Sequence, residues 1–100
     1  MTLKSVTIID PIHPGTILAL EFLEPLGLSA SALARHINVP PNRITSVING
    51  QRSITGDTAI RFAAAFGTSP EFWLNLQTHY DLEVARASTD ALDIAPLPAA

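Results

Sequence analysis

The stretch that decides the fold is INVPPNRITSVINGQR, residues Ile37–Arg52, in which two prolines precede a run with helical spacing. Pro41 suits the first position of a helix, where its missing N–H would have no intrahelical partner in any case. Pro40 is kept out of helical geometry by the proline that follows it. We therefore expect a helix over residues 41–49, closed by Gly50.

A shorter helix is expected directly before this one. Ser29 is a good N-cap, and the apolar residues of ASALARHI, residues 30–37, recur with helical spacing. Asn38 follows, and asparagine tolerates the left-handed backbone conformation that a sharp turn requires. Two helices joined by so short a turn form a helix-turn-helix, whose second helix is the one that reads DNA.

At about 100° per residue, the helix over residues 41–49 has two contrasting faces. The apolar face is expected to pack in the core, and it consists of Ile44, Val47 and Ile48. The opposite face is small and polar. Amides and hydroxyls suit the edges of bases in the major groove, and arginine suits guanine or phosphate. With the loop that follows, the predicted DNA-binding residues are Asn42, Arg43, Thr45, Ser46, Asn49, Gln51 and Arg52.

The charge of the chain is segregated in a way that supports this interpretation. Over all 100 residues the formal net charge is −3, which by itself argues against nucleic acid. Residues 25–70, however, contain four arginines and one aspartate, whereas the segments on either side are acidic. The acidic ends predict a second partner that is basic. The alternative for the polar helix face is that it is solvated and binds nothing.

Three more helices are expected, which makes the chain a compact all-α domain of five helices. They cover residues 14–24, ended by Pro25 with Gly27; 56–66, capped by Thr55; and 70–87, capped by Ser69 and with a bend near Asp81. The expected division is an N-terminal arm (1–12), a helix-turn-helix domain (13–87) and a flexible C-terminal tail (88–100). Within the arm, SVTII (5–9) is expected to pair as a short edge strand.

The last helix carries more apolar residues than one buried face holds. Five of them fit an arc of about 120°, the width of a normal buried face, namely Phe72, Trp73, Leu76, Tyr80 and Val84. Leu74 and Leu82 point the other way and are predicted to form a dimer interface, against the alternative of scattered surface leucines. A dimer is expected because few cations make one subunit bind DNA weakly, so that two half-sites are needed.

No catalytic constellation is found in the sequence, so we do not expect an enzyme. His13, His36 and His79 lack metal-ligand spacing and are expected in capping, surface or packing roles. The chain has no cysteine, HExxH motif or phosphate-binding loop, and neither metal nor cofactor is expected. No apolar run approaches the ~20 residues of a membrane span, and the start is unlike a signal peptide, so we expect a cytoplasmic protein.

Three segments resemble HigA-type antitoxins of bacterial toxin–antitoxin systems, a branch of the Cro and phage-repressor-like (XRE) helix-turn-helix family. They are HPGTILALEFLEPLGLS (13–29), VPPNRITSVINGQRSITGDTAIRFAAAFGTSPEFWLNLQ (39–77) and YDLEVA (80–85). The resemblance implies a lambda-repressor-like five-helix DNA-binding domain that acts as a homodimer on a palindromic operator. It also implies repression of its own operon and direct binding of a HigB-type toxin, a ribosome-dependent mRNA endonuclease.

The resemblance also assigns residues. Matched position by position, the family's DNA-facing helix and following loop fall on Arg43, Thr45, Ser46, Asn49 and Arg52. Many relatives carry basic residues where this chain has Ala19, Asn42 and Gln51, and an acid where it has Thr16. The two losses near the DNA-facing helix, at Asn42 and Gln51, weaken the expectation of tight operator binding. Two other interpretations stay open: a solitary transcriptional repressor without a toxin, and a protein-interaction module that has lost DNA binding.

Overall fold

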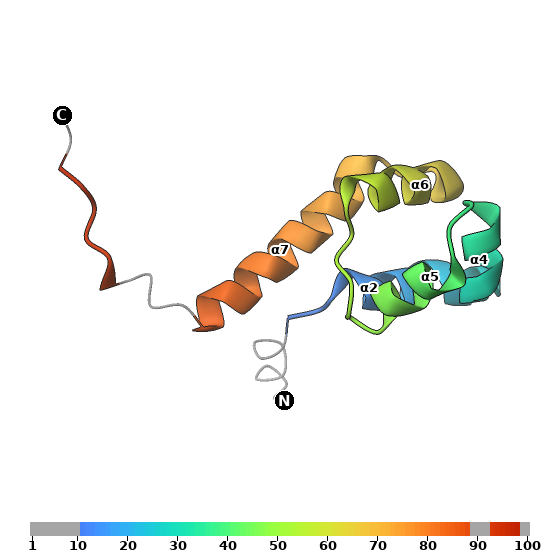
Figure 1. Cartoon of the computed structure of the whole chain (residues 1–100), viewed down its shortest axis with the longest axis horizontal. Helices are drawn as coiled ribbons and strands as arrows, with labels where there is room; N and C mark the ends of the chain where they lie inside the picture. The colour runs from blue at the N-terminus through green and yellow to red at the C-terminus, as the bar shows by residue number, and fades with distance from the viewer. Residues whose placement is uncertain (1–10, 89–92, 99–100) are drawn as a thin grey trace.

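A computed structural model describes residues 11–88 and 93–98 of the chain. The described part forms five helices and contains no β-strand, so the all-α prediction is confirmed (Figure 1). The edge strand expected over residues 5–9 lies outside the described residues. The helices are a first helix made of α2 (Pro14–Ile17), η1 (Leu18–Leu23) and α3 (Glu24–Leu26), then α4 (Ala30–His36), α5 (Pro41–Ile48), α6 (Gly56–Phe66) and α7 (Pro70–Ser88).

The helix starts predicted from capping residues are confirmed. Ser29 accepts a backbone hydrogen bond at 3.0 Å ahead of α4, Thr55 accepts one at 3.5 Å ahead of α6, and Ser69 accepts one at 3.0 Å ahead of α7. These side chains satisfy amides that every helix leaves without a partner in its first turn. Because a cap acts within three residues of itself, the local sequence is enough to locate these starts.

The end of the first helix differs from the prediction, which placed it at Glu24. The helix instead continues through Pro25 to Leu26, and Gly27 ends it with a left-handed backbone at φ 61°. The reason is the π-helical segment η1, in which the Glu24 amide donates to the Ala19 carbonyl five residues back. The backbone hydrogen bonds are therefore already shifted from the α-helical to the π-helical pattern when the chain reaches Pro25. Pro25 has no N–H to donate, and in a regular α-helix it would interrupt the bonding at this point.

Trp73 lies at the centre of the core, as predicted, and is fully buried. Its ring packs against Phe62 of α6 and Phe22 of η1, with ring centroids 5.0 and 4.9 Å away. The indole N–H donates to the Thr68 hydroxyl at 2.8 Å, so the one polar atom of the ring is satisfied inside the core. A single side chain thus joins the first helix, α6 and α7.

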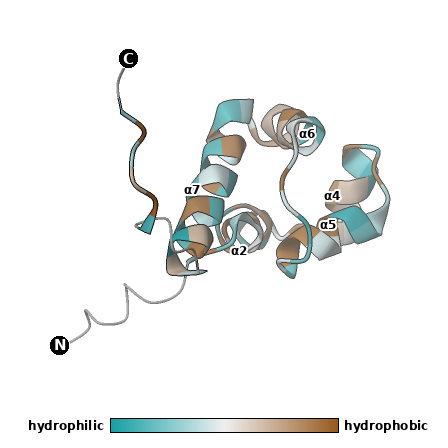
Figure 2. Ribbon diagram, turned by 60° about the vertical axis from the view of Figure 1, so that its left-hand side comes forward, coloured by the Kyte–Doolittle hydropathy of each residue, from teal (hydrophilic) through white to brown (hydrophobic). Residues whose placement is uncertain are grey.

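The last helix is longer than the surface that covers it. α7 runs as one helix to Ser88 without the bend expected near Asp81, and its second half extends beyond the other helices (Figure 1). Apolar and polar bands alternate along its length (Figure 2). Phe72 and Val84 are 38% and 41% exposed, so their predicted burial was wrong. Periodicity identifies an apolar stripe, but it does not tell how far the opposing surface reaches.

Candidate nucleic-acid interface

The turn between α4 and α5 has the geometry of a helix-turn-helix. Asn38 adopts the left-handed conformation at φ 60°, as predicted, and is the only non-glycine residue in the described part of the chain to do so. The Val39 amide then donates back to the Ala34 carbonyl at 3.0 Å, which closes the turn. Pro40 is extended and Pro41 is the first residue of α5, so both proline predictions are confirmed.

The position of α5 is determined by its apolar face and by a close approach of α2. Ile44 and Val47 are fully buried and Ile48 is half-buried, as predicted. On the same side, Gly15 lies so near α5 that an added Cβ atom would stand 1.8 Å from the Val47 carbonyl oxygen. Two backbones in such contact leave no room for a side chain, so α2 fixes the direction in which the opposite face of α5 points.

The polar side of α5 and the loop after it form an exposed surface. Asn42, Thr45, Asn49, Gln51 and Arg52 are exposed, while Arg43 and Ser46 are half-buried. The chain leaves α5 by a tight turn, because the amides of Gln51 and Arg52 both donate to the Ser46 carbonyl, at 2.8 and 3.1 Å. All seven predicted DNA-binding residues therefore lie on one continuous, accessible segment, and their contact with DNA stays a prediction.

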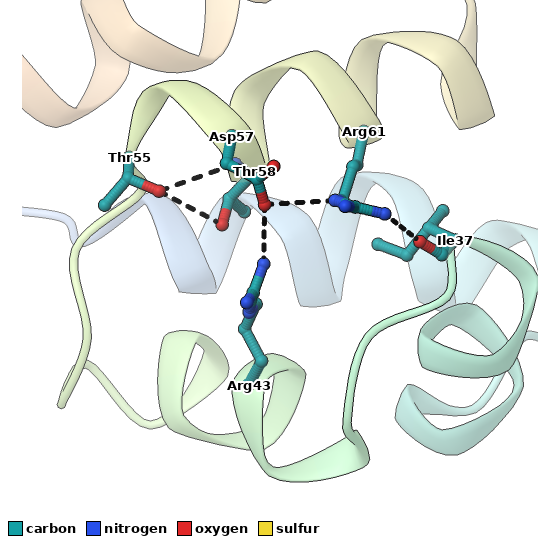
Figure 3. A network of polar contacts seen from close by, with 6 residues as sticks. All are labelled: Ile37, Arg43, Thr55, Asp57, Thr58 and Arg61. Carbon is teal, nitrogen blue, oxygen red and sulfur yellow. Dashed lines mark hydrogen bonds and ion pairs between the residues drawn. The ribbon is translucent and has the colours of Figure 1, made fainter.

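A network of ion pairs and hydrogen bonds joins α5 to α6 and to the end of α4 (Figure 3). Arg43 Nη1 lies 2.7 Å from Oδ2 of Asp57, which is in the first turn of α6. The same oxygen accepts a bond of 3.0 Å from Nε of Arg61, whose Nη1 donates to the Ile37 carbonyl at 2.7 Å. The hydrogen bond from Arg61, and to a smaller extent the one from Arg43, lower the pKa of the Asp57 carboxyl below its ordinary value. The carboxylate is therefore charged at neutral pH.

This network was not predicted from the sequence, in which Asp57 and Arg61 were considered only as part of the charge of residues 25–70. The spacing of these two residues, i to i+4, is a signal that predicts their pairing. Nothing local predicts the approach of Arg43, because 14 residues separate it from Asp57 and the path of the loop between α5 and α6 decides whether they meet.

That loop is held by a buried glutamine, a role that was not predicted from the sequence. Gln77 of α7 accepts a hydrogen bond from the Ile54 amide at 2.8 Å through Oε1, and its Nε2 donates to Asp81 at 2.9 Å. Because both ends of the side-chain amide are bonded, the cost of burying it is offset. The signal for this role is its position one turn after Trp73, which places it on the buried side of α7. Gln77 thereby helps to fix the loop that carries Arg52.

His13 lies where the first helix meets α7. Its Nδ1 accepts a hydrogen bond from the Gly15 amide at 2.9 Å and so caps α2. Its ring packs edge-on against Tyr80 of α7, with centroids 4.8 Å apart. Burial lowers the pKa of the imidazole below its ordinary value, against a smaller upward effect of the Asp81 carboxylate. The neutral ring that burial favours is the form in which Nδ1 can accept, and the predicted capping and packing roles both apply to this histidine.

The other two histidines, His36 and His79, are exposed. Over residues 11–88 and 93–98, no three His, Asp or Glu side chains are grouped so as to hold a metal ion. Within the same residues, no single helix is both long and apolar enough to cross a membrane. Only Pro14–Leu26 and Ala30–His36 taken together reach that length and composition, and they are bent by 89°.

The arrangement of α4, the turn and α5 defines the class of protein. The sequence pattern of the helix-turn-helix family matches residues 20–73, which is more than half of the chain. The protein is therefore a lambda-repressor-like helix-turn-helix protein of a DNA-binding class, and not an enzyme.

Three relatives narrow this class. Antitoxin HigA-1 of Vibrio cholerae is 46% identical over 72 residues, which cover 72% of this chain and 68% of the relative. The structure of an addiction module antidote protein of a HigA family from Coxiella burnetii matches with a TM-score of 0.81 and 48% identity, over 89% of this chain and 100% of that one. Antitoxin HigA of Pseudomonas aeruginosa, solved with the higBA promoter, matches with a TM-score of 0.83 and 41% identity, over 89% and 100%. The chain belongs to the HigA family of antitoxins, which confirms the resemblance found in its sequence.

Proposed function

We propose that the chain binds the operator of its own operon through α5 and the following loop, as a homodimer, and represses that operon. The observation that carries this proposal is the set of amides, hydroxyls and arginines over residues 42–52, of which all but the half-buried Arg43 and Ser46 are exposed. It lies on the second helix of a helix-turn-helix, the element that enters the major groove. Membership of the HigA family supports the same assignment, since the Pseudomonas relative was solved with its promoter.

Arg52 offers a direct test of this proposal, because it is exposed and lies in the loop that follows α5. We expect Arg52→Ala to weaken binding to a duplex covering the region upstream of the chain's own reading frame. A lost phosphate contact should reduce the slope of log affinity against log salt by about one unit. Fluorescence anisotropy titrations at several salt concentrations measure both quantities.

The matched control for Arg52 is Arg86→Ala, which removes the same charge from α7. Arg86 is exposed and its ion pair with Glu83 is long, at 3.7 Å, so its loss should not alter the fold. If both variants lower the salt slope equally, the effect comes from total charge and not from a contact beside α5. If Arg52→Ala binds as the unaltered chain does, the loop is wrongly assigned.

The dimer is proposed to form through the outward side of α7. Leu74 and Leu82 are 36% and 46% exposed on a helix whose second half leaves the rest of the domain. Burying such side chains against a second copy removes apolar surface from water, and a two-fold dimer would pair the two recognition helices. We expect Leu82→Asp to shift the chain toward monomer in sedimentation equilibrium. The control is Ile60→Asp, which changes an exposed apolar residue on α6 and should leave the dimer intact. If Leu82→Asp also leaves the dimer unchanged, Leu82 lies on the free surface and not in the interface.

We further propose that the chain neutralises a HigB-type toxin by direct binding. Its support is membership of the HigA family and the acidic composition of residues 71–100. This segment contains five acidic residues and one arginine, a negative balance that suits a basic protein partner. The test is to express the chain with the product of the adjacent reading frame, and to ask whether the two co-purify and whether the chain restores growth. A solitary repressor of the same fold would bind its operator yet fail both parts of this test.

A further inference from the structure

We propose that Asp57 is a positioning residue for DNA recognition, and that its carboxylate holds the Arg43 guanidinium in one orientation beside the polar face of α5. The inference rests on the proposed function, because an arginine oriented in this way acts only if α5 meets DNA. It goes further than that function, since it assigns a specificity role to a residue on a different helix.

The geometry shows how the arginine is held. Asp57 and Arg61 are one turn apart on α6, and Oδ2 of Asp57 accepts from both Arg61 and Arg43 (Figure 3). Arg61 is itself tied to the backbone at the Ile37 carbonyl. The carboxylate therefore has a second anchor that does not depend on Arg43. A side chain held through such a chain of bonds has few orientations open to it.

Arg43 still has donors left for a ligand. Its guanidinium carries five N–H groups over three nitrogens, and the bond to Asp57 uses Nη1. In the described part of the chain, no hydrogen bond uses its Nε or Nη2. The Arg43 side chain is 27% exposed to solvent, so it is neither buried in the core nor fully accessible. A planar fork with one edge held and another edge open suits a base edge or a phosphate.

Two opposite effects of Asp57 on DNA binding follow from its charge and its position. A carboxylate near the phosphates repels them, so it weakens binding to every sequence. The same carboxylate orients Arg43 before DNA arrives, so less side-chain freedom is lost on binding and only one arrangement of base acceptors is matched. Asp57 should therefore lower affinity in general and raise the preference for one sequence.

The first measurement uses a randomised duplex pool to select the sequence that the unaltered chain prefers. Dissociation constants are then compared for this selected duplex and for each of its single-base-pair variants. We expect Asp57→Ala to tighten binding to mismatched duplexes about two- to fivefold at 0.1 M salt. We expect it to reduce discrimination by about tenfold at one base-pair position, and to leave the others nearly unchanged.

Glu71→Ala is the matched control, because Glu71 is the second residue of α7 as Asp57 is the second residue of α6. It removes the same charge from the first turn of a helix, but it should not alter discrimination. Arg61→Lys keeps the charge and removes the planar fork that anchors Asp57. It should cause a smaller loss of discrimination at the same position. If Asp57→Ala fails to fold, this variant tests the proposal in its place, and full discrimination in Arg61→Lys would then overturn it.

The effect must also depend on Arg43. In an Arg43→Ala background, the further change Asp57→Ala should produce no additional loss of discrimination. A loss that persists in this background would show that Asp57 acts by another route, and full discrimination in folded Asp57→Ala would equally overturn the proposal. In both of these cases the unaltered chain still selects a sequence, so the proposed function survives. If the unaltered chain enriches no sequence from the pool, the proposed function fails and the role of Asp57 fails with it.

Discussion

Replacing Gly15 with alanine should unfold or severely weaken the domain and abolish binding to the operator. The added methyl group would stand 1.8 Å from the Val47 carbonyl oxygen and 2.9 Å from the Cα atom of Ile48, which are backbone atoms and cannot rotate away. Either α2 and α5 separate or the methyl group overlaps the carbonyl. Overpacking of this kind costs about 3 kcal/mol or more when the neighbour is rigid.

Thermal unfolding followed by circular dichroism measures this effect. A domain of this size loses about 4–8 °C in Tm for each kcal/mol, so we expect a fall of at least 12 °C, or no cooperative transition at all. Gly56→Ala is the control, because Gly56 begins α6 and an added Cβ there would meet nothing within 4 Å. Equal Tm values for the two variants would contradict the close approach of α2 to α5.

Trp73→Ala should have the second largest effect. The side chain is fully buried and packs against both Phe22 and Phe62, so its removal leaves a large cavity between three helices. Truncation of a buried aromatic residue costs about 3–5 kcal/mol. It would also leave the Thr68 hydroxyl without the indole N–H that donates to it. Equilibrium unfolding in urea gives the free energy directly, provided that the slope of the transition is unchanged.

Phe72→Ala is the comparison for Trp73→Ala, because it removes an aromatic ring from the preceding residue of the same helix. Phe72 is 38% exposed and lies at the edge of the aromatic cluster. Its truncation should cost about 1–2 kcal/mol, since much of its surface is already in water. Comparable losses in both variants would mean that Trp73 is not the centre of the core.

The helix-turn-helix was predictable because its signals act over a few residues. Two successive prolines, an asparagine at the sharp turn and a serine cap each bias the backbone of their immediate neighbours, and the structure follows them at Asn38, Pro41 and Ser29. The same reasoning placed Ile44 and Val47 in the core, since a helix with one apolar stripe must bury it. Five of the seven residues proposed to meet DNA were derived from the polar side of that helix, and Gln51 and Arg52 from the loop that follows it.

Prediction failed where the outcome depended on segments far apart in the chain. The burial of Phe72 and Val84 depends on how far other helices reach along α7, and helical periodicity contains no such information. Gln77 meets Ile54 across 23 residues, and Arg61 meets Ile37 across 24. The first helix passed its proline because the π turn before it had already shifted the hydrogen bonds.

The sequence alone determined that five helices form, where each of them begins and which side of α5 faces solvent. These properties follow from cap chemistry, proline geometry and the period of a helix, and each of them acts within a turn or two. The tertiary structure decided how α5 is held, with Gly15 against its backbone and Asp57 and Arg61 tying down Arg43. A backbone contact or a shared carboxylate exists only once distant helices have packed, so no local pattern along the chain determines it.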